Sequence, residues 1–167
     1  MIILFCVCPA AFADNLVLHV GTLLAVPGKP PLKNQTIVIS DNKITELADG
    51  FVNPAAGARL LDLKDQFVLP GLMDLHVHLL IELGPGSRSR TVTENETFTL
   101  LRGVNNARKT LYAGFTTVRD LGGSPESIYA IRDAIKTNLI PGPRVYAAGS
   151  SLAATGGMVT LMASAPI

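Results

Sequence analysis

The chain has 167 residues, enough for one medium-sized domain; 48% of them are hydrophobic, 16% are charged, and the formal net charge is +1. This composition predicts a packed core and argues against intrinsic disorder. The near-neutral charge, the lack of a basic cluster and the absence of tryptophan argue against nucleic-acid binding.

The first thirteen residues, MIILFCVCPAAFA, form an apolar run that ends in an A-x-A pattern before Asp14. We expect residues 1–13 to be a signal peptide, so that the protein is secreted or periplasmic, although the run lacks a positively charged start. The alternative is a buried N-terminal strand, and the run is too short to span a membrane. Both cysteines, Cys6 and Cys8, lie here, so the processed chain would have neither a disulfide nor a thiol nucleophile.

Residues 14–69 have the pattern of short strands joined by turns. Alternating apolar residues and turn residues predict strands at 16–26, 35–40, 43–47, 59–63 and 66–69. Tight turns are expected at Asp41–Asn42 and at Lys64–Asp65. His19 falls in the first strand, and we expect it to be a surface or turn-facing histidine.

The stretch FVLPGLMDLHVHL, residues 67–79, combines an apolar strand, a Pro-Gly break and a second strand. Asp74, His76 and His78 alternate on the second strand and therefore share one face, with Met73, Leu75 and Val77 predicted on the other. Neutral imidazole is a common ligand for zinc and related ions, so His76 and His78 are candidate metal ligands. Two histidines at this spacing are also compatible with ordinary polar positions on a half-buried strand.

Residues 79–92 are predicted to form a long polar loop after this strand. If the strand belongs to a barrel, the loop lies at the active-site end. Arg88 and Arg90 are then either contacts for an anionic group of a substrate or solvated loop charges.

Helices and strands alternate in the rest of the chain. A capping box at Thr93–Glu96 predicts a helix from there to about residue 113, with an apolar stripe at Leu100, Leu101, Val104, Ala107, Arg108 and Leu111. Further elements are a strand at 115–120, a helix from Ser124 and Pro125 to about residue 138, and a strand from 144. This βα alternation predicts a parallel sheet. Asp120 closes the second strand and either lines a pocket or holds the following Leu-Gly-Gly turn.

Three segments together resemble the amidohydrolase superfamily: PGLMDLHVH (70–78), AGFTTVRDLGG (113–123) and GPRVYAAGSSLAATGG (142–157). The similarity is to the branch of Xaa-Pro dipeptidases and imidazolonepropionase-like enzymes, and it covers residues 16–157. It implies an α/β chain in which a small N-terminal β-sandwich (14–69) precedes the first three βα units of an incomplete (β/α)8 barrel (70–157). The chain departs from the pattern at Met158, where the branch usually has a histidine, and residues 158–167 form an atypical apolar tail.

The resemblance also implies chemistry. Members bind one or two divalent ions, usually zinc, which activate water for hydrolysis of C–N bonds. It assigns His76 and His78 as metal ligands, with Asp74 orienting the strand or its loop, and leaves Asp120 and Arg88 as pocket candidates. The remaining ligands and the general base are expected beyond Ile167. The substrate is expected to be a small molecule such as a dipeptide, and the intact parent protein is a possible oligomer.

A complete (β/α)8 domain takes about 250 residues, so we expect this chain to be an inactive N-terminal fragment of such an enzyme. Two alternatives stay open. The chain is a non-catalytic secreted α/β scaffold or binding protein that retains the start of the fold, or it comes from a cyclic-amide hydrolase such as an imidazolonepropionase or dihydroorotase.

Overall fold

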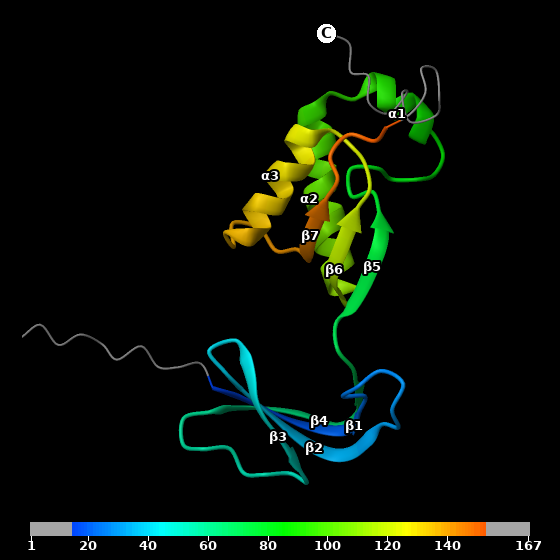
Figure 1. The fold of residues 1–167 in the computed structure, drawn as a ribbon. Helices are drawn as coiled ribbons and strands as arrows, with labels where there is room; N and C mark the ends of the chain where they lie inside the picture. The colour runs from blue at the N-terminus through cyan, green and yellow to red at the C-terminus, as the bar shows by residue number, and fades with distance from the viewer. Residues whose placement is uncertain (1–14, 153–167) are drawn as a thin grey trace, which may run out of the picture. The chain divides into compact units, whose positions relative to one another are not determined.

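The computed structural model describes residues 15–152 (Figure 1). The chain divides into two compact units between Pro70 and Gly71. The predicted signal peptide at 1–13, the end of the predicted barrel region at 153–157 and the apolar tail at 158–167 lie outside the described residues. Within the described part of the chain, no helix is long and apolar enough to cross a membrane.

The first unit is built on one four-stranded sheet in the order β3-β2-β1-β4. β1 pairs antiparallel with β2, β2 pairs antiparallel with β3, and β4 runs parallel to β1. Its strands are β1 (Leu16–Leu23), β2 (Leu32–Ser40), β3 (Lys43–Asp49) and β4 (Arg59–Val68). Asp41 and Asn42 have φ of 52° and 60°, which two-residue hairpin turns require, so the predicted tight turn is confirmed.

The predicted turn at Lys64–Asp65 is wrong, because β4 continues through both residues to Val68. The pairing between β1 and β4 shifts register at this point, and the additional residues of β4 form a bulge opposite Gly21. A Cβ on Gly21 would lie 1.7 Å from the carbonyl oxygen of Lys64. Gly21 on β1 therefore leaves room for the bulge at Lys64 and Asp65, and β4 continues as one strand.

Of the two positions expected for His19, at the surface or facing a turn, the surface one is wrong, because its side chain is only 5% exposed. Its Nε2 donates to the carbonyl oxygen of Val52 at 2.8 Å, and its ring lies against Phe51. Thr36, its partner on β2, donates to the carbonyl oxygen of Gly50 and accepts from the amide of Val52. These bonds hold the loop after β3 against the sheet, which explains the burial.

Residues 15–70 form a single layer rather than two packed sheets. A small apolar cluster of Val20, Leu23 and Ile37 is buried, whereas Ile44 and Phe67 are 70% and 55% exposed. The predicted β-sandwich needs a second sheet to cover such side chains, and it stays a prediction.

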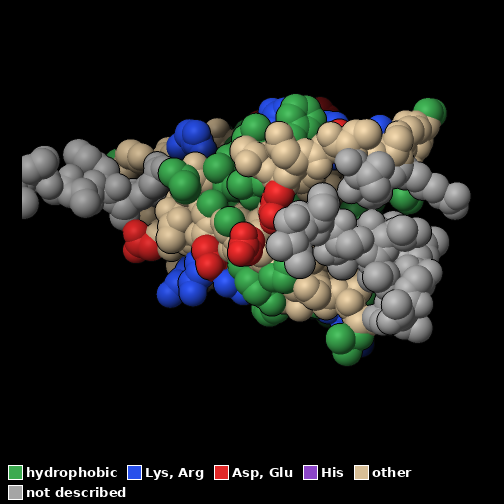
Figure 2. Space-filling view, turned by 90° about the horizontal axis from the view of Figure 1, so that it is seen from above, with side chains coloured by type: hydrophobic (Ala, Val, Ile, Leu, Met, Phe, Trp, Pro, Cys, Tyr) green, Lys and Arg blue, Asp and Glu red, His purple; other side chains and the backbone are tan. Residues whose placement is uncertain are grey.

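Figure 2 views the molecule from above Figure 1 and shows hydrophobic side chains (green) at the surface beside acidic ones (red).

The second unit contains a parallel sheet in the order β5-β6-β7. Its elements are β5 (Leu72–Val77), α1 (Ser87–Thr93), α2 (Glu96–Tyr112), β6 (Phe115–Asp120), α3 (Pro125–Lys136) and β7 (Arg144–Ala147). The mixed α/β class and the predicted parallel sheet are therefore confirmed. Closure into an eight-stranded barrel stays a prediction, since the described residues include three parallel strands.

Two helix boundaries differ from the prediction. The segment expected to be a loop contains the short helix α1, which ends at Thr93, and the Thr93 hydroxyl donates to the carbonyl oxygen of Ser89 rather than capping α2. Asn95 is the N-cap of α2 and accepts from the amide of Phe98 at 2.8 Å. Asn95 can serve as the N-cap in place of Thr93, because an asparagine side chain also accepts hydrogen bonds from the unpaired amides of the first helical turn.

The core of this unit lies between the sheet and helices α2 and α3 (Figure 1). The buried residues are Leu79, Leu80, Ala107, Val118, Ile128, Ile131 and Val145. The predicted buried faces are thus confirmed for Ala107, Ile128 and Ile131, but Leu101 is 60% exposed. On the side of the sheet away from the helices, Tyr146 and Met73 are 59% and 68% exposed.

Candidate metal-binding site

The candidate site lies where the parallel strands of the second unit end. β5 ends at Val77, so His76 stands in its last part and His78 directly after it. Asp120 is the last residue of β6, and Val77 pairs with Asp120. Ligands in open and closed parallel sheets bind at this carboxyl edge, because the loops that follow the strands gather there.

The two histidine rings lie next to each other. Their centroids are 5.5 Å apart with an interplanar angle of 70°, so the rings are neighbours as the alternating pattern predicts. The His76 side chain is exposed and that of His78 is half-buried. The prediction for the apolar residues of this strand is only partly right. Val77 packs on the core, whereas Met73 and Leu75 are 68% and 57% exposed.

One carbonyl group sets the orientation of His78. Its Nδ1 lies 2.9 Å from the carbonyl oxygen of Gly122. Because a carbonyl oxygen only accepts hydrogen bonds, Nδ1 carries the proton in the neutral ring, and Nε2 keeps its lone pair. Histidines that bind metals commonly have their second ring nitrogen fixed in this way.

Asp120 is fully buried at the turn that carries this carbonyl. One carboxylate oxygen accepts from the amide of Leu79 at 2.7 Å, and the other accepts from the amide of Gly122 at 3.1 Å. Burial raises the pKa of Asp120 above its usual range, although these two hydrogen bonds and nearby His78 oppose the rise. Asp120 therefore holds the turn, as one of its two predicted roles requires, and its place in a pocket stays a prediction.

Asp74 acts on the strand itself, as the sequence indicates. Its Oδ1 accepts from the amide of His76 at 2.9 Å, across the irregular part of the pairing between β5 and β6. Arg119 on β6 donates to the carbonyl oxygen of Leu75 at 2.9 Å. Both contacts satisfy backbone groups that the irregular ladder leaves unpaired.

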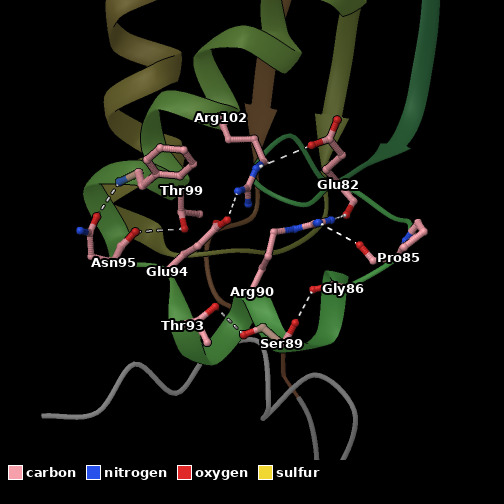
Figure 3. Close-up of polar contacts among 11 residues, drawn as sticks. Glu82, Pro85, Gly86, Ser89, Arg90, Thr93, Glu94, Asn95, Thr99 and Arg102 are labelled. Carbon is pink, nitrogen blue, oxygen red and sulfur yellow. Dashed lines mark hydrogen bonds and ion pairs between the residues drawn. The ribbon is translucent and has the colours of Figure 1, made fainter.

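Two arginines follow β5 in the segment that was predicted to be a loop. Arg88 lies within α1, and its predicted contact with a substrate stays a prediction. Arg90 donates to the carbonyl oxygens of Glu82 at 2.7 Å and Pro85 at 3.2 Å (Figure 3). Its guanidinium therefore fastens its own loop.

A polar network that local sequence patterns did not indicate ties this loop to α2. Arg102 forms a hydrogen-bonded ion pair with Glu94, and its Nε lies 3.8 Å from Glu82 (Figure 3). The side chains of Arg102 and Glu94 are only 12% and 17% exposed. The hydrogen bond to Glu94 raises the pKa of Arg102 above its usual range. The segment that follows the two histidines is thus anchored to a core-packed helix.

Within residues 15–152, no cluster of three or more His, Cys, Asp or Glu side chains is placed to hold a metal ion. The described residues therefore supply a pair of candidate ligands. Two imidazoles on one tetrahedral ion would place their ring centroids about 5 Å apart. The observed separation of 5.5 Å fits such a pair.

Comparison with known proteins places this geometry in a family. The chain resembles a solved Xaa-Pro dipeptidase with bound methionine, with a TM-score of 0.78 and 32% identity over 87% of this chain and 36% of that one. It is 30% identical over 110 residues to a dihydroorotase of Staphylococcus aureus, covering 62% of this chain and 23% of that protein. It is 35% identical over 74 residues to a 5'-deoxyadenosine deaminase of Methanosarcina barkeri, covering 44% of this chain and 17% of that protein.

The chain thus spans about a third of the length of the solved dipeptidase and less of the two curated relatives. The model of the amidohydrolase family matches residues 67–165, which is more than half of the chain and includes both histidines and Asp120. This chain belongs to the amidohydrolase family.

Proposed function

We propose that this chain supplies the first two metal ligands, His76 and His78, of a metal-dependent hydrolase that acts on C–N bonds of amide or peptide type. The observation that carries the proposal is the pair of adjacent imidazoles at the carboxyl edge of the parallel sheet, one of them with its Nδ1 bonded to a backbone carbonyl. Family membership supports it, since amidohydrolases generally use divalent metals. We propose zinc as the ion, because imidazole suits it.

The chain's own residues would do three things at this site. His76 and His78 would hold the ion. The Gly122 carbonyl would keep the His78 ring turned with Nε2 outward, and Asp74 would hold the backbone at His76. When bound, the ion would lower the pKa of a water molecule and polarise the carbonyl of the substrate.

We propose that this chain alone is inactive. Catalytic zinc sites generally use three protein ligands, and residues 15–152 supply a pair. The exposed Met73 and Tyr146 belong to the side of the sheet that faces inward when a barrel closes. Further ligands and the general base would come from strands beyond this chain. We also propose export through residues 1–13 and a small-molecule substrate.

The substrate class that we favour is a dipeptide of Xaa-Pro type. The similarity to the solved dipeptidase over 87% of this chain supports it. A cyclic amide is the second candidate. It is favoured by the similarity to the dihydroorotase, which extends over 110 residues.

A calorimetric titration of the full chain with zinc tests the proposal. We expect one weak site per chain that is lost in both His76→Ala and His78→Ala. The third histidine, His19, is an internal control: it is 5% exposed and its Nε2 is bonded to Val52, so we expect it not to bind zinc. Equal zinc binding by wild type and both alanine variants would exclude this pair as the ligands.

A further inference from the structure

Three segments meet behind His78: the residues after β5, the end of β6, and the turn at 121–123. Asp120 joins them, because its two carboxylate oxygens accept from the amides of Leu79 and Gly122. The amide of Leu121 donates to the carbonyl oxygen of Val77 at 3.0 Å. The turn is therefore fastened to both strands that flank the candidate site.

Gly122 links this turn to the imidazole. Its amide is held by Asp120, and its carbonyl oxygen accepts from Nδ1 of His78. The other end of the same peptide group, the amide of Gly123, donates to the carbonyl oxygen of Gly149 at 3.1 Å. The peptide that orients the ring is thus bonded at both ends, and Asp120 fixes the residue on which it is built.

The position requires a carboxylate and not merely a polar side chain. Two backbone amides point at Asp120, and an ionised carboxylate has an acceptor for each, whereas an asparagine side chain has one. Asp120 is fully buried, so water cannot replace a lost partner. The asparagine oxygen would keep the shorter bond to Leu79, and its amide group would face the amide of Gly122.

We propose that Asp120 is a positioning residue of the metal site: through Gly122 it fixes the ring and the tautomer of His78, so that Nε2 is presented to the ion. This inference rests on the proposed role of His78 as a ligand. Without the fixed carbonyl, the proton is free to move between the two ring nitrogens, and part of the population presents N–H instead of a lone pair. Loss of such an outer partner typically lowers metal affinity about 10- to 100-fold.

The test uses the full 15N-labelled chain at about pH 8, where imidazoles are ordinarily neutral. Long-range 1H–15N spectra of the metal-free protein report which nitrogen of His78 carries the proton. Wild type should show the Nδ1–H form, and Asp120→Asn should show a mixture and bind zinc at least about tenfold more weakly. Asp133→Asn makes the same chemical change at an exposed carboxylate of α3 and should leave both readouts unchanged.

A second variant breaks the next link while keeping Asp120. Gly122 has φ of +158°, a backbone conformation that L side chains rarely adopt, and a Cβ on it would lie 1.8 Å from Oγ of Ser151, so Gly122→Ala should shift the turn. We expect the same mixture of His78 tautomers. This variant carries the test if Asp120→Asn does not fold.

The outcomes separate the two proposals. A folded Asp120→Asn, or Gly122→Ala, with the wild-type His78 spectrum and zinc affinity would overturn the positioning role. Failure of the wild-type chain to bind zinc, together with altered His78 spectra in both variants, would support the Asp120–Gly122–His78 link and count against the proposed function alone.

Discussion

Replacing Arg102 by methionine should loosen the segment that follows the two histidines. Its guanidinium forms a hydrogen-bonded ion pair with Glu94 (Figure 3), and the two side chains are 12% and 17% exposed. Methionine keeps the aliphatic packing but leaves the Glu94 carboxylate without its charged partner. Breaking a fully buried pair costs about 3–5 kcal/mol, and a hydrogen bond to a charged group contributes about 1.5–3 kcal/mol. For this partly buried pair we expect a loss of about 2 kcal/mol.

A double-mutant cycle isolates the pair from the other effects of each change. Urea unfolding of Arg102→Met, Glu94→Gln and the double variant should give a coupling free energy of about 1–2 kcal/mol. Arg132 and Asp133 provide the comparison within the same unit. Their side chains are 38% and 59% exposed, so the same cycle should give a much smaller coupling than that of Arg102 and Glu94.

Salt provides a second criterion. The coupling between Arg102 and Glu94 should persist in about 1 M NaCl, because screening is weak for groups shielded from water. A coupling no larger than that of the exposed Arg132–Asp133 pair, or one abolished by salt, would refute the idea that this network anchors the loop.

Three further perturbations test other parts of the structure. In urea unfolding, Gly21→Ala should lower the free energy of unfolding by at least about 2 kcal/mol, because its Cβ would lie 1.7 Å from the backbone of Lys64. Gly57→Ala should lower it by about 1 kcal/mol, because Gly57 has φ of +85° but open space around it. Ile128→Ala should cost about 2–5 kcal/mol, against less than about 1 kcal/mol for Leu139→Ala, because their side chains are 0% and 78% exposed. Since burial raises the pKa of Asp120, the native state keeps that proton to higher pH than the unfolded chain. The contribution of Asp120 to the free energy of unfolding should therefore fall as pH rises from about 3.8, and Asp120→Asn should lack this contribution in urea titrations. A wild-type profile that instead rises in parallel with that of the variant would contradict this sign.

The features that sequence patterns predicted are local ones. Alternation of residues placed His76 and His78 together, and the rings are neighbours at 5.5 Å. The spacing of Ile128 and Ile131 marked the buried face of α3, and both are essentially inaccessible. In each case the residues that decide the outcome lie within one turn or one strand of each other.

The features that sequence patterns missed depend on distant partners. Lys64 and Asp65 have the composition of a turn, yet β4 continues because Gly21 on another strand admits the bulge. His19 is buried because the loop at Val52 folds over it. No window of sequence around either residue contains the group that decides its environment.

The candidate site shows the same division. The two histidines are recognisable from spacing and resemblance, whereas the carbonyl that orients His78 belongs to a glycine, whose side chain carries no chemical signal. Asp120 was recognised as a strand-end carboxylate with two possible roles. Its role in holding the turn depends on the positions of the Leu79 and Gly122 amides, which sequence patterns do not give.

X-ray absorption of the zinc-loaded full chain counts the imidazole ligands around the ion and thereby tests whether His76 and His78 bind it. We expect two histidine nitrogens at about 2.0–2.1 Å, with oxygen ligands completing the shell. We also expect His76→Ala and His78→Ala each to remove one imidazole from the spectrum. A spectrum without histidine, or one that neither substitution changes, would contradict the assignment of this pair as the metal ligands.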